Sequence, residues 1–300
     1  IDMQRVRELF RAPERVAQAD FLRREVAARM HERLMLIKAT PERVLDAGCG
    51  TGADLVHLQQ RYPSAQVIGL DGVPAMLAAA ARREEQAASA VQRLLHRLAP
   101  AALRPGVPGA ALVCSDFARL PLAAGSVDML WSNLALHWHP HPDMVFSEWR
   151  RVLRVEGLLM FSGFGPSTFK EVRAAFSVLD DAPHTLSFVD MHDLGDMLIH
   201  GGFSTPVMDM ETITITYDST ARLLAELRAW GGNPLSTRRR GLIGRRAWQR
   251  VLDAFEVQRG ADGKLHLTCE VVYGHAFRPA PRVTAAGESI VRFDPPRPRR

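Results

Sequence analysis

Apolar residues along the chain follow two alternating patterns, short continuous runs and stretches in which they recur every three or four positions. The first pattern is typical of buried strands and the second of amphipathic helices. Residues Glu14–Lys38 have the helical spacing and predict one long helix, which Pro41 ends before a strand at Val44–Ala47. Such a helix can cover the mouth of a ligand site. The residues on its apolar face are Leu22, Val26, Met30, Leu34 and Ile37.

The same alternation continues through the middle of the chain and predicts a doubly wound, mostly parallel α/β sheet. The further strands expected there are Val67–Leu70, Ala110–Cys114, Val127–Trp131 and Leu158–Ser162. The helices expected between them are Ala53–Gln60, Pro74–Ala99 and Pro142–Leu153, and Gly157 is expected to form the turn into the last of these strands.

Beyond Gly163 the pattern predicts additional helices and two more strands, which complete a seven-stranded sheet. The expected helices are Thr168–Leu179, Asp190–His200, a helix capped by Asp218-Ser219-Thr220, and Arg245–Phe255; the expected strands are Val207–Tyr217 and Leu265–Tyr273. The two helices between the last strands predict a lid. The expected organisation is a helical arm (1–40), an α/β core (41–217) with a helical insertion near 165–201, a lid (218–262), the last core strand (263–277) and a disordered basic tail (278–300).

Composition fits one core with an added lid, because 47% of the 300 residues are hydrophobic. Three scattered cysteines, Cys49, Cys114 and Cys269, offer neither a disulfide framework nor a metal knuckle and favour a reducing cytoplasm. No run approaches the length of a membrane span, and the charged N-terminus lacks an apolar signal core, which argues against export.

The net charge of +5 is concentrated in the tail, where residues 278–300 carry six arginines against Glu288 and Asp294. A basic surface for nucleic acid is therefore weakly supported. The segment after the fourth strand reads Ser132-Asn133-Leu134-Ala135 and lacks the N-P-P-[YF] pattern of amino-methylating enzymes. A second basic segment can either recruit an acidic partner or form a solvated loop. Its arginines are Arg238, Arg239, Arg240, Arg245 and Arg246.

The stretch Arg43–Asp54, RVLDAGCGTGAD, runs from a strand through a glycine-rich turn into a helix. Gly48, Gly50 and Gly52 allow backbone N–H groups at the helix start to approach a ligand. A tight turn without a ligand and a dinucleotide site are the alternatives. The carboxylate of Asp46 would repel a pyrophosphate but can accept hydrogen bonds from an ammonium group, so its charge favours S-adenosylmethionine (SAM) over NAD.

Polar residues also follow the next strands, where an open α/β sheet places its ligand crevice. Asp71, nineteen residues beyond Gly52 and followed by Gly72, is placed to bind a ribose diol. Asp116 and Phe117 follow the third strand, and Asp116 has an alternative role as a turn cap. The candidates after the fourth strand are Asn133, His137 and Trp138.

The cluster of His137, His139 and His141 does not predict a metal site. Trp138 and Pro140 separate the three side chains, and no cysteine or carboxylate cluster completes a tetrahedral set. We expect loop histidines or contacts with a substrate instead.

These residues together resemble the class I SAM-dependent methyltransferase family. The resemblance implies that Asp46 and the glycine loop hold the methionine end of SAM, that Asp71 and Gly72 hold the ribose, that Asp116 contacts the adenine amino group with Phe117 packed on the ring, and that Asn133 completes the site. His137 and Trp138 become positioning candidates near the reacting methyl group.

A narrower resemblance rests on the N-terminal arm, the LDAGCGTG loop, the SNLALHW segment and the two-helix lid. Over roughly residues 6–277 these are similar to the malonyl-acyl-carrier-protein O-methyltransferase family of biotin synthesis. That resemblance implies esterification of the free carboxylate of a malonyl thioester, with acyl carrier protein as a partner of the arginine-rich segment. A carboxylate acceptor is already ionised at neutral pH and needs no general base.

Two alternatives stay open. DFLRREVAARM and DLGDMLIHGGF are also similar to the complex I assembly factor family, whose members keep the SAM site and are associated with arginine hydroxylation. The second alternative is methylation of another small-molecule acid, because the LDAGCGTG loop is shared by many methyltransferases and does not identify the acceptor.

Overall fold

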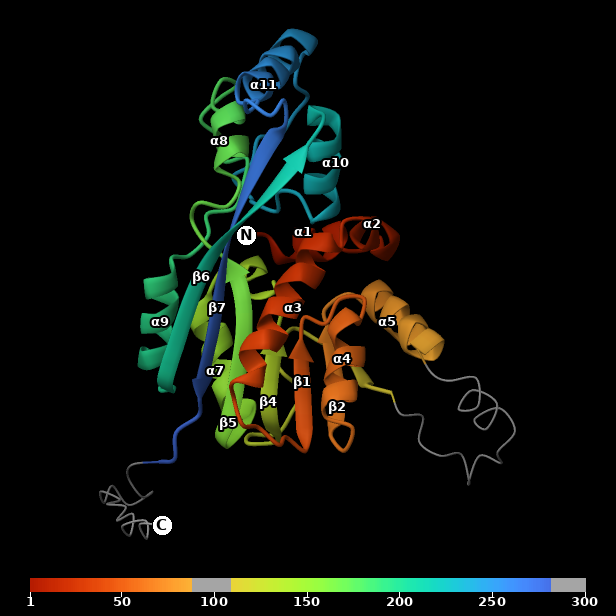
Figure 1. Cartoon of the computed structure of the whole chain (residues 1–300), viewed down its shortest axis with the longest axis vertical. Helices are drawn as coiled ribbons and strands as arrows, with labels where there is room; N and C mark the ends of the chain where they lie inside the picture. The colour runs from red at the N-terminus through yellow and green to blue at the C-terminus, as the bar shows by residue number, and fades with distance from the viewer. Residues whose placement is uncertain (88–108, 282–300) are drawn as a thin grey trace.

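The computed structural model describes residues 1–87 and 109–281, and one seven-stranded sheet forms its centre (Figure 1). The strand order is β3-β2-β1-β4-β5-β7-β6. Neighbours from β3 to β5 pair in parallel, whereas β7 is antiparallel to both β5 and β6. The predicted doubly wound sheet is confirmed. The strands are β1 Arg43–Ala47, β2 Gln66–Asp71, β3 Ala111–Cys114, β4 Val127–Ser132, β5 Leu153–Phe164, β6 Ser204–Tyr217 and β7 Leu265–Phe277.

Helices cover both faces of the sheet. One apolar layer joins β1, β2 and β4 to α3 (Phe21–Met35), α4 (Ala53–Arg61) and α5 (Pro74–Ala87). The opposite layer packs the sheet against α7 (Pro142–Val152) and α9 (Met191–His200). The predicted continuation of the α5 helix to Ala99 and most of the predicted basic tail lie outside the described residues. Within the described parts of the chain, no helix has both the length and the hydropathy to cross a bilayer.

The N-terminal arm differs from its prediction. The single helix expected over Glu14–Lys38 is two helices, α2 (Pro13–Gln18) and α3, and a further helix, α1 (Met3–Leu9), precedes them. The break falls at Ala19, whose carbonyl accepts a hydrogen bond from Trp230 Nε1 at 2.8 Å instead of continuing the helical ladder. Leu22, Val26, Met30 and Leu34 of the predicted apolar face are buried, whereas Ile37 lies beyond the end of α3 and is only partly buried.

The strands β6 and β7 continue beyond the rest of the sheet and carry the lid at their far ends (Figure 1). The lid has its own apolar core, in which α8 (Lys170–Phe176) packs with α10 (Thr220–Ala229) and α11 (Arg245–Val257). The strand β5 begins earlier than predicted. Gly157 is an irregular position inside β5, next to Glu156 with its φ of 63°, and not a turn before the strand.

Candidate active site

The glycine loop between β1 and α4 is fixed by backbone contacts. The N–H groups of Gly48 and Cys49 donate to the carbonyl of Leu70 at 2.8 and 2.9 Å. Gly48 has a φ of 84°, and a Cβ added there would lie 2.5 Å from the Cβ of Ala135. Only glycine fits this position without displacing the loop after β4. The sequence pattern therefore produces a rigid strand-to-helix turn at the carboxyl end of the sheet.

Asp71 at the end of β2 holds the loop from the other side. Its two carboxylate oxygens accept hydrogen bonds from Gly50 N at 3.0 Å and from Val73 N at 2.8 Å. Burial raises the pKa of Asp71, while these two hydrogen bonds and the charge of Arg23 oppose the rise. Asp71 faces a cavity at the sheet edge, so its oxygens can also accept from ligand hydroxyls.

We call this space the cofactor cavity. The predicted site residues that line it are Gly48, Gly50, Asp71, Gly72, Asp116, Phe117, Asn133 and Trp138. Two other predicted cofactor residues lie behind its wall, and neither lines it. Gly52 packs against Ala80 of α5, and Asp46 is buried beneath the glycine loop.

Asp46 is a buried carboxylate with an incomplete set of contacts. Its Oδ2 is sealed from solvent and has no hydrogen-bond partner among the described residues. Burial raises the pKa of Asp46 well above its usual range, the nearby Asp54 raises it further, and Arg23 opposes both. The raised pKa favours the protonated, neutral form of Asp46, and a cationic group nearby would favour its ionised form.

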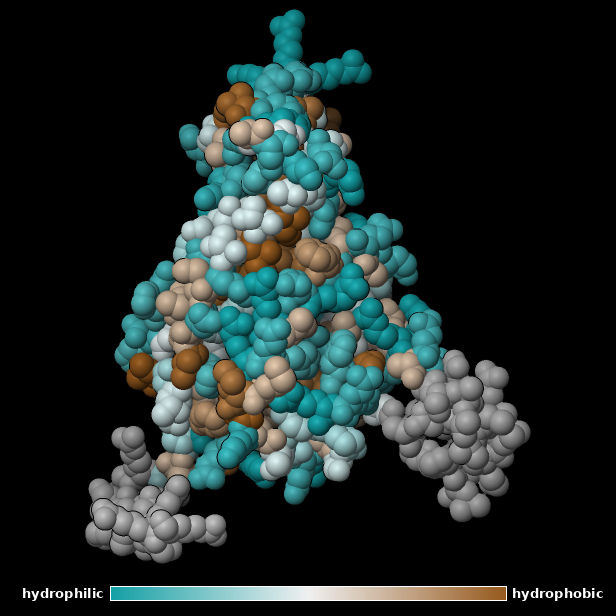
Figure 2. Space-filling view, in the orientation of Figure 1, coloured by the Kyte–Doolittle hydropathy of each residue, from teal (hydrophilic) through white to brown (hydrophobic). Residues whose placement is uncertain are grey.

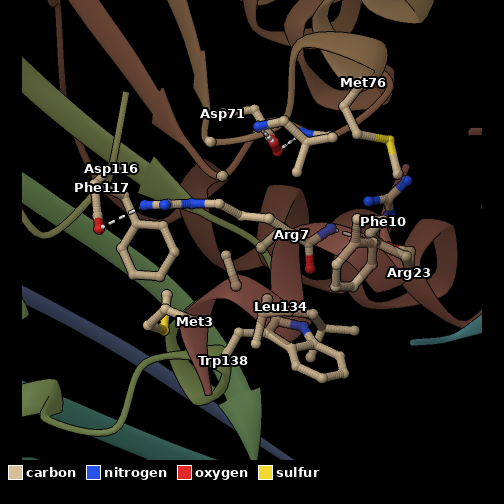
Figure 3. Close-up of a pocket in the computed structure, with 17 residues that line it drawn as sticks. Met3, Arg7, Phe10, Arg23, Asp71, Met76, Asp116, Phe117, Leu134 and Trp138 are labelled. Carbon is tan, nitrogen blue, oxygen red and sulfur yellow. Dashed lines mark hydrogen bonds and ion pairs between the residues drawn. The ribbon is translucent and has the colours of Figure 1, made fainter. Parts of the chain in front are cut away.

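Asp116 and Phe117 form the opposite end of the cofactor cavity (Figure 3). Asp116 Oδ1 accepts from Ala118 N at 2.9 Å, which is the turn-capping role that the sequence left open. Its Oδ2 lies 3.4 Å from Arg7 Nη2, and Arg7 reaches across the cavity to it from α1. The pair is partly exposed and weak, so a ligand amino group can replace Arg7 at this oxygen.

Asn133 has its side chain fully engaged inside the protein. Its Oδ1 accepts from Ser162 Oγ at 3.0 Å, and its Nδ2 donates to Asp54 Oδ2 at 3.1 Å and to the carbonyl of Arg23 at 3.0 Å. Asp54 also accepts from Trp131 Nε1 at 3.1 Å. This network ties α3, α4, β4 and β5 together beneath the cavity, so Asn133 shapes the site through its backbone and its packing.

Sequence reasoning missed the residues that α1 and α3 contribute to the cofactor cavity, which are Met3, Val6, Arg7, Phe10 and Arg23. Arg23 comes closest to the glycine loop, with its Nη1 2.6 Å from where a Cβ on Gly50 would stand. The guanidinium of Arg23 is held by Asp20 at 3.0 and 3.1 Å. One signal in the sequence pointed to Arg23, because the helix predicted over Glu14–Lys38 was expected to cover the mouth of the ligand site. The residues of α1 showed no such amphipathic spacing and were not predicted.

A second space, the aromatic cavity, has a volume of about 230 Å³ and lies between the sheet edge and the lid. A small space of about 60 Å³, the junction, lies between the two cavities, and Trp138 lines all three. The side chains that line the aromatic cavity include His137, Phe164, Phe169, Phe188, Trp230 and Trp248. Two parts of the chain that are distant in sequence, the β4 end and the lid, thus form one space.

His137 lies on the 3-10 turn Leu136–Trp138 and lines both the junction and the aromatic cavity. Its ring packs against Phe164 with centroids 4.7 Å apart and against Trp138 at 5.0 Å. Burial lowers the pKa of His137 to about 3. The imidazole is therefore neutral at physiological pH and can donate one hydrogen bond, but it is a poor base.

The structure places the other two histidines of the predicted cluster, His139 and His141, outside the aromatic cavity. The Nδ1 atom of His139 lies 3.0 Å from the carbonyl oxygen of His141. A different group, His31, Asp54 and His57, brings its potential metal-ligating atoms within 4.8 Å of one another. Three arginines line the same hollow, and their positive charge opposes binding of a cation there. These are Arg24, Arg61 and Arg83.

Comparison with known families places a methyltransferase domain on residues 45–161, the part that carries the glycine loop, Asp71, Asp116 and Asn133. Among solved structures, the YcgJ protein from Bacillus subtilis matches with a TM-score of 0.57 at 13% identity, covering 84% of this chain and 98% of that one. A putative methyltransferase from Bacillus halodurans matches with a TM-score of 0.57 at 16% identity, covering 85% and 99%. These two likenesses establish the fold.

Curated relatives match almost the whole chain. The malonyl-[acyl-carrier protein] O-methyltransferase of Laribacter hongkongensis (strain HLHK9) is 49% identical, over 99% of this chain and 97% of that protein. The protein of the same name from Gallionella capsiferriformans (strain ES-2) is 46% identical, over 97% and 96%. The alignments therefore include the arm and the lid as well as the methyltransferase core. They support the resemblance to the malonyl-acyl-carrier-protein O-methyltransferase family over the resemblance to the complex I assembly factor family.

Proposed function

Because the chain belongs to the malonyl-[acyl-carrier protein] O-methyltransferase family, we propose that it methylates the free carboxylate of a malonyl thioester on acyl carrier protein. SAM is the methyl donor, and the ester product is the one that the resemblance assigns to biotin synthesis. The reaction joins the carboxylate oxygen to the methyl carbon while the carbon–sulfur bond breaks, and its electrons stay on sulfur. No proton moves.

The cofactor cavity fits SAM. When bound, SAM supplies a methyl group made electrophilic by the attached sulfonium. Asp71 would hold the ribose hydroxyls, and Asp116 with Phe117 would hold the adenine. Asp46 lies behind the cavity wall, where an ionised carboxylate would favour the cationic methionine end through its charge, and Arg23 is placed to hold the carboxylate of that end.

The observation that carries the choice of a carboxylate acceptor is the neutral His137 between the two cavities. An amine or hydroxyl acceptor must lose a proton, whereas a carboxylate has already lost it. Burial keeps the pKa of His137 near 3, so this imidazole is a poor acceptor for such a proton. It can instead donate a hydrogen bond to the acceptor and hold an oxygen toward the donor. Aromatic walls exclude water from the reacting groups.

We assign docking of the carrier protein to the arginine-rich segment that leads into α11. Trp248, three residues into that helix, lines the aromatic cavity, so the segment flanks the cavity entrance. Arg239 is held by Asp180 at 2.6 Å. Arg240, Arg245 and Arg246 are exposed and form no ion pair with a described carboxylate. Figure 2 shows hydrophilic side chains beside apolar patches at the lid end of this face.

The test of the proposed function uses labelled SAM and two forms of acyl carrier protein. We expect a base-labile methyl ester with malonyl-carrier protein and none with acetyl-carrier protein, which has the same thioester but no free carboxylate. Label on both forms would indicate a different acceptor group. Tight SAM binding without product on either form would contradict the proposal and support a non-catalytic, assembly-type role.

The docking assignment is tested with R245E/R246E. We expect the KM for malonyl-carrier protein to rise by about tenfold or more with kcat unchanged, because charge complementarity acts mainly on encounter. The matched control is K38E/R43E, which changes the net charge equally at the amino end of β1, away from the lid. An equal rise in both variants would contradict a local docking surface. The KM for malonyl-pantetheine should not change in either.

A further inference from the structure

Among the described residues, the place where donor and acceptor meet offers no positive side chain other than Arg23, which is paired with Asp20. The junction is lined by Phe10, Leu134, Phe164 and Trp230, with His137 and Trp138 between the two cavities. His137 is uncharged because burial disfavours its protonated form. A carboxylate transferred from water into such surroundings loses its hydration and gains little in return.

Arg23 is the one cation that lines the junction among the described residues, and it is already paired. Its Nε and Nη2 lie 3.1 and 3.0 Å from Asp20 Oδ1, and Nη2 lies 3.5 Å from Thr51 Oγ1. Asp20 itself is buried and lines the same junction. The two opposite charges leave the junction close to neutral, and Arg23 is directed toward the glycine loop.

The charged groups of the aromatic cavity are also occupied or peripheral. His184 contacts Asp180 at 2.9 Å and stacks on Phe176 with ring centroids 4.5 Å apart. Arg228 is an exposed residue of α10 that lines the aromatic cavity but not the junction. Neither stands at the junction. The described walls thus provide aromatic surface and two neutral hydrogen-bond donors, the ring N–H groups of His137 and Trp138, where the acceptor carboxylate must react.

We propose that the junction leaves the acceptor carboxylate without a protein counter-ion, so that the acceptor binds only against the positive charge of the donor. This inference rests on the proposed function and deepens it. Two opposite charges close together in a water-excluded site attract strongly, and this attraction offsets the desolvation of the carboxylate. His137 holds the carboxylate by one hydrogen bond and acts as a positioning residue.

The arrangement predicts how the acceptor enters and leaves. Before transfer, the site holds one carboxylate and one sulfonium. After transfer, both charges have disappeared, because the carboxylate has become a methyl ester and the sulfonium has become the thioether of S-adenosylhomocysteine. A second acid therefore cannot bind well until the thioether product has been replaced by SAM. The acceptor site is selective for acids in one state of the enzyme only.

The test compares two ligands in two complexes of the full chain, without turnover. One complex contains sinefungin, which carries an ammonium group in the region of the methyl group, and the other contains neutral S-adenosylhomocysteine. Calorimetry measures binding of malonyl-pantetheine and of its methyl ester to each. We expect the acid to bind about tenfold or more tightly to the sinefungin complex, while the ester shows no such preference. For each ligand we divide its affinity for the sinefungin complex by its affinity for the S-adenosylhomocysteine complex. Comparing this ratio for the acid with that for the ester separates the charge interaction from effects of shape.

Equal affinity of the acid for both complexes would overturn the inference, as would the same preference for acid and ester. The variant R23K separates the alternative in which Arg23 holds the acceptor. In that alternative Arg23→Lys weakens the acid in both complexes alike, whereas we expect the preference for the sinefungin complex to persist. Failure of the proposed function gives a different result, because no methyl ester then forms from malonyl-carrier protein and SAM at any concentration. If the enzyme forms the ester but the acid shows no preference for the sinefungin complex, only the counter-ion proposal is refuted.

Discussion

The cofactor cavity and the aromatic cavity meet at Trp138 but differ in their polar groups. The first holds the carboxylates of Asp71 and Asp116 among apolar side chains, whereas the second is lined mainly by aromatic rings from the β4 end, residues 164–188 and the lid. The first can recognise a donor by hydrogen bonds and charge. In our proposal the second binds the acceptor, and its aromatic walls exclude water. The difference shows how one sheet edge binds a charged donor and keeps its reacting centre dry.

The largest expected effect breaks the polar side of this comparison. Asp71→Ala removes the acceptor of the Gly50 and Val73 N–H groups together with a ribose contact, so SAM affinity should fall by about 100-fold. Calorimetry with S-adenosylhomocysteine measures the loss. The control is Asp128→Ala, because Asp128 also accepts two backbone N–H groups, at 2.6 and 2.7 Å, but at the amino end of β4. Comparable loss of affinity in both variants would assign the effect to general destabilisation.

The next prediction tests the neutrality of the aromatic side. The usual pKa of histidine is near 6.5, and burial lowers that of His137 to about 3. As pH falls below 6.5, the unfolded chain takes up a proton that the folded protein does not, so stability present at pH 7 is lost. This site should cost about 2 kcal/mol between pH 7 and pH 5.

His137→Phe removes that linkage, so denaturation by urea should show a smaller loss of unfolding free energy over this interval than in the unaltered protein, by the same amount. The control His192→Gln changes an exposed histidine of α9 and should keep the full loss. If the His137 variant is as acid-sensitive as the unaltered protein, the folded imidazole is charged, and the contrast between the two cavities does not hold.

The same contrast explains how much the sequence could predict. Asp71, Asp116 and Asn133 each follow an apolar strand directly, and strand ends of a parallel sheet meet at one edge, so local patterns located the polar cavity. Asp46 and Gly52 belong to the motif but lie behind the cavity wall, and a motif cannot show which of its residues face a ligand. Helical spacing also located α10 and α11, the two helices of the predicted lid.

The aromatic cavity and the arm were harder to predict because they depend on contacts between distant segments. Trp230 binds the carbonyl of Ala19, 211 positions away, and stacks on Phe169 with ring centroids 5.8 Å apart. That contact ends the helix that periodicity predicted to be continuous. Phe10 meets Trp138 at 5.1 Å in the same way. Amphipathic spacing identifies which faces are buried, but not which of them come together.

A smaller effect sharpens the boundary between the two cavities. Arg23 lines both the cofactor cavity and the junction, and we assign it to the donor. Arg23→Leu should weaken SAM by about tenfold, because a partly buried charged hydrogen bond is lost, and should leave the KM for the acceptor nearly unchanged. The control is Arg24→Leu, whose side chain is 67% exposed and lies outside the cofactor cavity. A rise in acceptor KM without loss of SAM affinity would reassign Arg23 to the acceptor.

The smallest expected effect concerns Arg7 of α1, which covers the end of the cofactor cavity that we assign to adenine. Arg7 lies 3.4 Å from Asp116, and its side chain is 50% exposed, so the pair contributes little. Arg7→Ala should change SAM affinity by no more than about threefold, and in the direction of tighter binding, because Asp116 Oδ2 no longer exchanges partners. The control Arg5→Ala alters a neighbouring residue that pairs with Glu8 on the same helix at 3.3 Å and should leave affinity unchanged. Tenfold weaker binding in the Arg7 variant would make this arginine a direct ligand contact and would extend the charged side of the site onto the arm.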